Sequence, residues 1–267
     1  AAAKVMLTVT DSTRKGYDME YTFLEFVSDD QIKSEAQNLV GQAMDILNDA
    51  TVGTTIRFRT DQYGKIVKYY NLKDIRKQAK EVLAKAISKM PYADSLRAVG
   101  LNPDKLMSMI DSDDLVDGYT EEIELLFNYH GDQYKIGETE SHEDATEKEY
   151  ASDTKTDIWL DPDTYEYGIS ADVYSYIPRE DIKVLLGNLI EYFTDEESAK
   201  DVREGLDTEF DSQVTTDGVC NSYVRISYFN DGWPQEVVSQ NNISLGDRQK
   251  LTQKYITWDY RSVGHAE

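Results

Sequence analysis

Alternation of apolar and polar residues at period two is the feature that most constrains the fold, because only an extended strand places every second side chain on one face. In the longest stretch of alternating residues, one predicted strand face is mostly apolar and consists of Tyr165, Tyr167, Ile169, Ala171 and Val173. Glu166, Gly168, Ser170 and Asp172 form the other side. Val5, Leu7 and Val9 alternate in the same way. We expect further strands over 21–27, 56–59, 65–70, 223–229, 233–239 and 250–258, which predicts a mainly antiparallel sheet.

Helical spacing separates these strands. Apolar residues recur three and four apart over 29–47, 71–90 and 178–193, and another helix is expected from Thr194. Asn71 is expected to cap the helix that follows it, and Thr120 to begin a short helix. The acidic stretch 138–157 fits a loop or an exposed edge ribbon. The predicted fold class is α+β, with a curved, mainly antiparallel sheet packed on helices.

The domain organisation has one internal correspondence. Residues 55–64 resemble residues 223–232, since each segment carries an arginine between apolar strand residues and ends in a turn with glycine. Duplication and convergent hairpin chemistry both explain the match. We expect a single compact domain over 1–267, built from two related halves of about 1–130 and 131–267 if the duplication is real.

The charge of the chain restricts its partners. Lys and Arg number 28 against 51 Asp and Glu, a net charge of −23, which disfavours binding to nucleic acid. No apolar run approaches the roughly 20 residues of a membrane helix, so the chain is not expected to be transmembrane. A single cysteine, Cys220, precludes an intramolecular disulfide and a multi-cysteine metal site.

Motifs for catalysis and metal binding are missing from the sequence. Segments starting at Asp111 and Asp161 fail the EF-hand pattern, and His142-Glu143 has no second histidine at the zinc-protease spacing. No serine, cysteine or phosphate-loop signature is present. We therefore assign no catalytic residue, no metal ligand and no cofactor, and expect a protein that is not an enzyme. Paired carboxylates for glycoside hydrolysis stay open, because their test is a separation in space.

Three hairpin-like segments resemble a group of exported bacterial proteins of unknown function, of the type found in gut Bacteroidetes. These segments are Arg57–Gly64 with Lys65-Ile66-Val67, Tyr134–Gly137 after a helix, and Asn230–Pro234 with Gln235–Ser239. Such proteins look like the lipoprotein-localisation-factor half-barrel, in which a curved antiparallel sheet wraps around helices. The chain departs from that pattern in its helix over 28–49 and its two helices over 178–209. The resemblance implies an envelope location and a concave apolar face.

The aromatic residues give the candidate binding site. Tyr outnumbers Phe by 19 to 7, and tyrosine and tryptophan suit an amphipathic cleft or a sugar-stacking surface, as well as a half-exposed sheet without a ligand. The candidate ligand-binding residues are Trp159, Tyr165, Tyr167, Trp233 and Trp258. We expect a non-enzymatic binding protein for a lipid or another amphipathic small molecule. The alternatives are a carbohydrate-binding or carbohydrate-processing protein and a surface interaction protein.

The expected location is outside the cytoplasm. The chain begins Ala1-Ala2-Ala3-Lys4 without methionine or a signal segment, which fits an exported protein of the periplasm, the outer envelope or the extracellular space.

Overall fold

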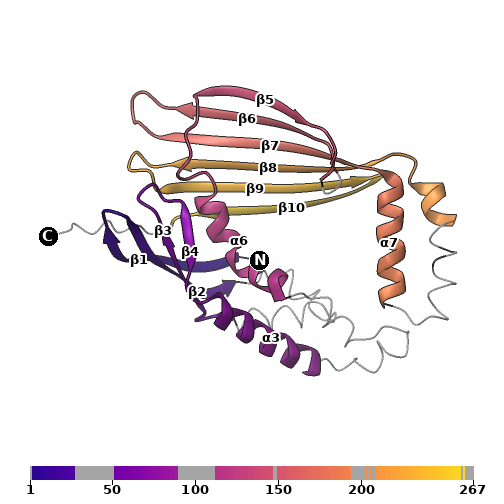
Figure 1. Ribbon diagram of the computed structural model, residues 1–267, viewed down its shortest axis with the longest axis horizontal. Helices are drawn as coiled ribbons and strands as arrows, with labels where there is room; N and C mark the ends of the chain where they lie inside the picture. The colour runs from indigo at the N-terminus through magenta and orange to yellow at the C-terminus, as the bar shows by residue number, and fades with distance from the viewer. Residues whose placement is uncertain are drawn as a thin grey trace. The chain divides into compact units, whose positions relative to one another are not determined.

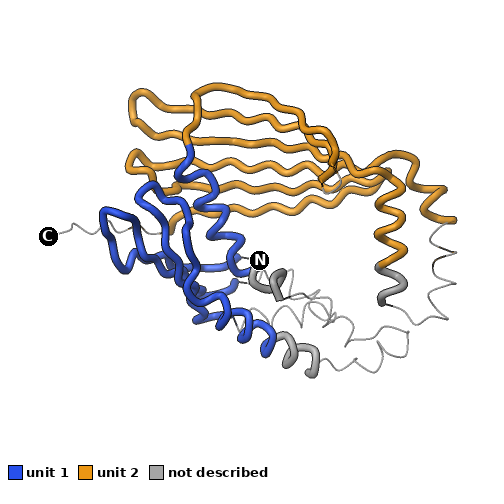
Figure 2. Tube along the Cα trace, viewed as in Figure 1, with its two compact units in different colours: residues 1–132, 192–195 blue, residues 133–191, 196–267 orange. Residues whose placement is uncertain are grey.

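The computed structural model describes residues 2–27, 51–89, 112–146, 149–193, 203, 205, 208–259 and 261. The chain divides into two compact units (Figure 2). Unit 1 comprises residues 1–132 and 192–195, and unit 2 comprises residues 133–191 and 196–267. The boundary lies two residues from the one that the internal correspondence suggested.

In the part of unit 1 that the structure describes, a four-stranded antiparallel sheet is accompanied by the helices α3 (Leu72–Lys89) and α6 (Ser112–Phe127) (Figure 1). The strands lie in chain order: β1 (Ala2–Thr13), β2 (Gly16–Val27), β3 (Thr55–Thr60) and β4 (Ile66–Tyr69). Helices α3 and α6 pack against each other. Tyr21, Ile56 and Phe58 of the sheet are buried, and the Phe58 ring meets the Phe127 ring of α6 at 5.7 Å between centroids. Helices and sheet therefore share one apolar core.

Of two helix-start predictions in unit 1, the position of the first is confirmed, because α3 begins at Leu72 and the Asn71 carbonyl accepts from the Ile75 N–H at 3.1 Å, whereas the second is wrong. The Asn71 side chain does not cap α3: its Oδ1 accepts from the Arg57 backbone N–H at 2.9 Å, and its Nδ2 donates to the Thr55 carbonyl at 2.8 Å. The Asn71 side chain thus forms hydrogen bonds with the β3 backbone beyond the point where β4 ends. Thr120 lies inside α6 rather than at its start. The helix expected over 29–47 lies outside the described residues.

Unit 2 is a six-stranded antiparallel sheet, again in chain order (Figure 1). Its strands are β5 (Gly137–Glu143), β6 (Ser152–Leu160), β7 (Tyr167–Ile177), β8 (Gly218–Tyr228), β9 (Pro234–Leu245) and β10 (Arg248–Thr257). Helix α7 (Arg179–Phe193) and the helical residues 208–213 lie between β7 and β8 in sequence. The acidic stretch 138–157 contains β5 and the first part of β6, and all seven residues of β5 are exposed. An edge ribbon, one of the two expectations for this stretch, is what the structure has.

The longest predicted strand begins later than its alternation suggests. Tyr165 lies in the turn before β7 with a φ of 60°, in the left-handed region, and its side chain is 68% exposed. It therefore does not share a sheet face with Tyr167, because a left-handed turn residue breaks the two-residue repeat.

The β3–β4 and β8–β9 hairpins share one local geometry. Gly64 and Gly232 close the turns with φ values of 88° and 86°. In both hairpins the ladder shifts at the residue pair next to the turn, between Arg59 and Thr60 and between Ser227 and Tyr228. A short loop with a glycine bulge is a common hairpin connection, so this agreement fits both duplication and convergence.

The expected mainly antiparallel sheet with packed helices is confirmed. Half-barrel curvature and duplication stay predictions. Among the described residues, no helix combines the length and the apolar character that crossing a bilayer requires.

Candidate functional site

The two faces of the unit 2 sheet differ in burial at the centre of β7, β8 and β9. Ile169, Ile226 and Val237 stand opposite one another on β7, β8 and β9 and are at most 3% exposed, which makes theirs the core face. Helix α7 packs on this same face, because a Cβ on Gly218 would lie 2.6 Å from the Ile182 Cδ1. We call the opposite side the open face. Its strand side chains are all exposed or half-exposed, Gly168 apart.

The open face combines aromatic, amide and charged side chains in register. Its aromatic residues are Trp159, Tyr174, Tyr176, Tyr223 and Tyr255. One row crosses all six strands, with each residue directly opposite the next: His142, Asp153, Tyr174, Asn221, Asn242 and Leu251. The neighbouring row, which contains Asp172, is also polar. Asn221 Nδ2 donates to Asp172 Oδ1 at 2.5 Å, so a hydrogen bond joins the two rows. A solvated sheet with so many rings and amides offers both stacking and hydrogen bonding.

A hollow of about 420 Å³, open to solvent, lies where the open face meets the β5 edge. Its lining residues come from β5, β6 and β7: Glu140, Ser141, His142, Asp153, Thr154, Lys155 and Tyr174. Lys155 Nζ lies 3.3 Å from a Glu138 oxygen and 4.0 Å from a Glu140 oxygen. The hollow therefore holds both signs of charge beside one aromatic ring.

Asp153 is the most constrained side chain of the hollow. Its Oδ1 lies 2.7 Å from His142 Nδ1, and its Oδ2 accepts a hydrogen bond from the Tyr176 hydroxyl at 2.9 Å. The hydrogen bond with His142, and then the one from Tyr176, lower the pKa of Asp153. The hydrogen bond with Asp153 in turn raises the pKa of His142, with a smaller contribution from Asp144. The pair thus favours imidazolium and carboxylate together.

The five aromatic residues predicted to form a site lie at the same end of the sheet but do not share a face. The Trp159 ring lies against Gly168 on the open face, whereas Tyr167, next to Gly168 along β7, is on the core face. Tyr167 stacks on Tyr228 with 4.8 Å between ring centroids. Tyr165 is in the preceding turn. Trp159, Tyr165 and Tyr167 therefore do not lie together on one face of the sheet.

The other two candidates lie around the start of β9. Trp233 is in the turn before it, and Trp258 Nε1 donates to the Pro234 carbonyl at 2.6 Å. In the same turn, Asp231 forms an ion pair with Arg261, whose guanidinium lies 4.3 Å from the centroid of the Phe229 ring. The Trp258 indole thus joins the end of β10 to the start of β9.

The residues considered for metal binding have other partners. The Asp161 carboxylate accepts from the backbone N–H groups of Asp163 at 2.8 Å and Thr164 at 3.1 Å, which lowers its pKa and stabilises a turn. His130, in unit 1, packs on Gly64 and on the Phe127 ring. In the part of the chain that the structure describes, no group of three or more His, Cys, Asp or Glu side chains could hold a metal ion. Asp111 lies outside that part.

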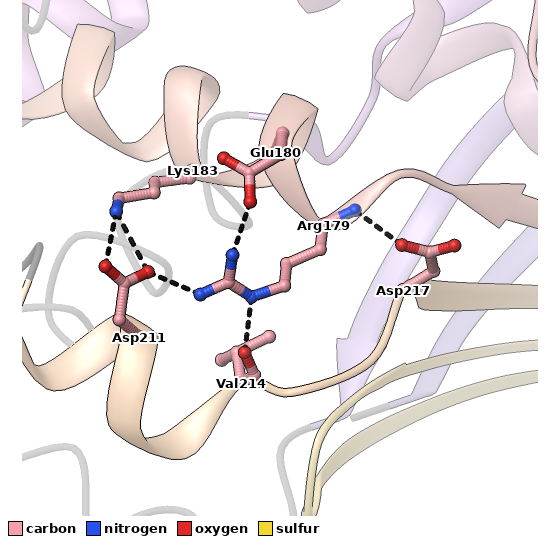
Figure 3. Close-up of polar contacts among 6 residues, drawn as sticks. All are labelled: Arg179, Glu180, Lys183, Asp211, Val214 and Asp217. Carbon is pink, nitrogen blue, oxygen red and sulfur yellow. Dashed lines mark hydrogen bonds and ion pairs between the residues drawn. The ribbon is translucent and has the colours of Figure 1, made fainter.

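The densest polar cluster is a clamp between α7 and the segment that leads into β8 (Figure 3). The Arg179 guanidinium donates to the Val214 carbonyl at 2.5 Å and pairs with Glu180 and Asp211, while its backbone N–H donates to Asp217 at 2.9 Å. Lys183 Nζ lies 2.9 Å from both Asp211 oxygens. These contacts join the start of α7 to the segment before β8, which favours a structural role for the clamp.

Sequence reasoning named His142 only as half of a zinc motif and did not name Asp153 or Tyr176. The signal was the register of the β5–β6 hairpin, which pairs His142 with Asp153. The sequence between the two strands carries no two-residue turn motif, so it does not fix that register.

Comparison with known proteins gives no relative: no family model, no curated protein and no solved structure matches the chain.

Proposed function

We propose that this is a non-enzymatic binding protein that holds an oligosaccharide on the open face of its six-stranded sheet. The observation that carries the proposal is the face itself, where Trp159, Tyr174 and Tyr255 stand exposed or half-exposed among amides and carboxylates. Aromatic rings stack on the C–H surfaces of sugars, while amides and carboxylates bond their hydroxyls. A solvated sheet needs some aromatic residues for its own stability, but it does not need them beside rows of hydrogen-bonding groups.

The hollow at the β5 edge is the proposed anchoring point. Tyr174 is 40% exposed and stands directly opposite Asp153, so one sugar ring could touch the ring and the carboxylate together. Lys155 supplies a donor from the same strand as Asp153. Each described residue of the lining carries a hydrogen-bonding side chain, which suits a ligand rich in hydroxyl groups.

The proposed setting is the envelope or the exterior of a bacterial cell. It rests on the resemblance of the hairpin segments to exported half-barrel proteins, and the curvature of that fold is part of the same proposal. Descent of the two units from one strand–helix–hairpin element is also part of the proposal, and the shared geometry of the β3–β4 and β8–β9 hairpins is compatible with it.

Binding to a panel of oligosaccharides, measured by native mass spectrometry and calorimetry, tests the function. Tyr174→Ala and Tyr255→Ala should each weaken binding by roughly fivefold, equivalent to about 1 kcal/mol for a lost stacking contact. Tyr63→Ala is the matched control, since Tyr63 is 66% exposed in a unit 1 turn. Equal losses in all three variants would contradict the proposed surface.

Solvent extraction of gently purified protein tests the amphipathic alternative. An amphiphile that co-purifies reproducibly, with no oligosaccharide bound at millimolar concentration, would overturn the proposal in favour of a lipid carrier.

A further inference from the structure

The contacts of His142 assign it a protonation state. Its Nδ1 lies 2.7 Å from Asp153 Oδ1, and its Nε2 lies 3.4 Å from Asp144 Oδ1. A neutral imidazole carries one N–H, so it can donate to only one of these carboxylates, whereas imidazolium donates to both. The arrangement favours the charged ring, and the raised pKa of His142, caused mainly by its hydrogen bond with Asp153, agrees with it.

The same hydrogen bond occupies a ligand-binding position. Asp153 has one oxygen engaged by His142 and the other by the Tyr176 hydroxyl. Each Asp153 oxygen keeps a second lone pair, and a sugar hydroxyl that approaches Oδ1 in the hollow shares that oxygen with the imidazolium, which weakens the bond that the hydroxyl can form. Since hydrogen bonds between charged groups are stronger than those from a neutral hydroxyl, the protonated histidine is the better competitor.

We propose that His142 is a proton-controlled competitor for Asp153, so that oligosaccharide binding in the hollow tightens as the pH rises and His142 loses its charge. This inference rests on the proposed function and adds its regulation. When the ring loses its charge and keeps the proton on Nδ1, its hydrogen bond to Asp153 comes from a neutral donor and is weaker, so Asp153 Oδ1 accepts more strongly from the ligand. Tyr176 continues to hold the other oxygen, so the carboxylate keeps its position.

The other charged groups around His142 do not replace it in this role. Asp144 follows on the same chain segment and is almost fully exposed. On β6, which pairs with β5, Lys155 is directed toward Glu138 and Glu140, and Glu140 lines the hollow beside His142. On β7, Tyr174 and Tyr176 complete the surroundings. Of these groups, histidine is the type whose ordinary pKa lies closest to neutral pH.

Histidine titration by NMR in the ligand-free protein tests whether the contact with Asp153 favours the charged form of His142. His142 should titrate above the ordinary value of about 6.5, and Asp153→Asn should lower its pKa. Glu143→Gln, on the same strand but the opposite face, is the control and should leave the titration unchanged. An identical His142 pKa in the wild-type protein and in Asp153→Asn would overturn the inference.

The second test asks whether the charge of His142 weakens oligosaccharide binding. It measures the binding of hexaoses of glucose, mannose, xylose and N-acetylglucosamine at about pH 5.5 and about pH 8. Affinity should be roughly fivefold higher at the upper pH, at the low end of measured couplings, and a bound hexaose should lower the His142 pKa by reciprocity. His142→Gln keeps a donor but cannot titrate, so its affinity should not change with pH. Glu143→Gln should keep the full pH dependence.

Two failures are distinguishable. If no hexaose binds at either pH, the proposed function is wrong and the inference fails with it. If a hexaose binds with the same affinity at both pH values, or if His142→Gln retains the pH dependence, the open face remains the binding surface and only the role of His142 is refuted.

Discussion

A single glycine determines how Trp159 packs against the sheet. A Cβ on Gly168 would lie 2.4 Å from Trp159 Cζ2 and 2.7 Å from the Ile226 carbonyl oxygen, so Gly168→Ala forces both to move. Overpacking of this kind costs about 1–3 kcal/mol. All three tryptophans belong to unit 2, so intrinsic fluorescence during urea unfolding follows the loss directly. Adding Trp159→Ala to Gly168→Ala should restore only part of the lost stability, because the clash with the Ile226 backbone remains.

Gly118→Ala is the matched control for this prediction. Gly118 lies inside α6, and a Cβ there would meet nothing within 4 Å. Alanine should stabilise unit 1 by about 0.5–1 kcal/mol through helix propensity, measured by far-ultraviolet circular dichroism. Destabilisation at Gly118, or no loss at Gly168, would contradict the contacts described.

Individual residue roles were the hardest to predict from sequence. Asn71 stands before a helix, where a cap is the usual role, but the end of β4 leaves backbone groups of β3 that its carboxamide satisfies instead. Asp153 and His142 meet only because of a hairpin register. Both are tertiary effects, which local propensity does not contain.

At the scale of elements, the clamp predicts how the stability of unit 2 depends on pH. Lys183, followed by Arg179, lowers the pKa of Asp211, so this carboxylate binds protons more weakly folded than unfolded. Its contribution to stability is present above the unfolded value of about 3.9 and is lost as the pH falls through the folded pKa. Asp211→Asn should therefore lower the urea midpoint at neutral pH, with the difference from wild type shrinking below about pH 4.

Tryptophan fluorescence measures these midpoints for unit 2 alone. Asp247→Asn, in the exposed turn between β9 and β10, is the control and should show a smaller change. A midpoint difference for Asp211→Asn that grows as the pH falls would show that the carboxylate is not stabilised by its cations.

The elements themselves were largely predictable. The period of two gave β2, β3, β4 and the three C-terminal strands within a few residues, and the helical period gave α3 and α7. The polar strand β5 has no apolar face, so its alternation carries no signal; both readings of that stretch stayed open for this reason. Helix α6 was placed too late because the acidic residues at 121–122 imitate a helix N-terminus.

At the scale of the whole molecule, net charge decides the response to salt. The chain carries −23, whereas the ion pairs of the described residues have exposed or half-exposed partners, and such pairs contribute about 0–1 kcal/mol each. Salt screens both repulsion and attraction, but repulsion dominates when charges of one sign are in such excess. We expect the melting temperature to rise between about 10 mM and about 200 mM sodium chloride.

Calorimetry measures this change in melting temperature. Sodium perchlorate at equal ionic strength is the control, because that salt screens charge equally without strengthening hydrophobic burial. A rise in both salts identifies screening, whereas a fall in both would mean that local ion pairs outweigh the excess of acids.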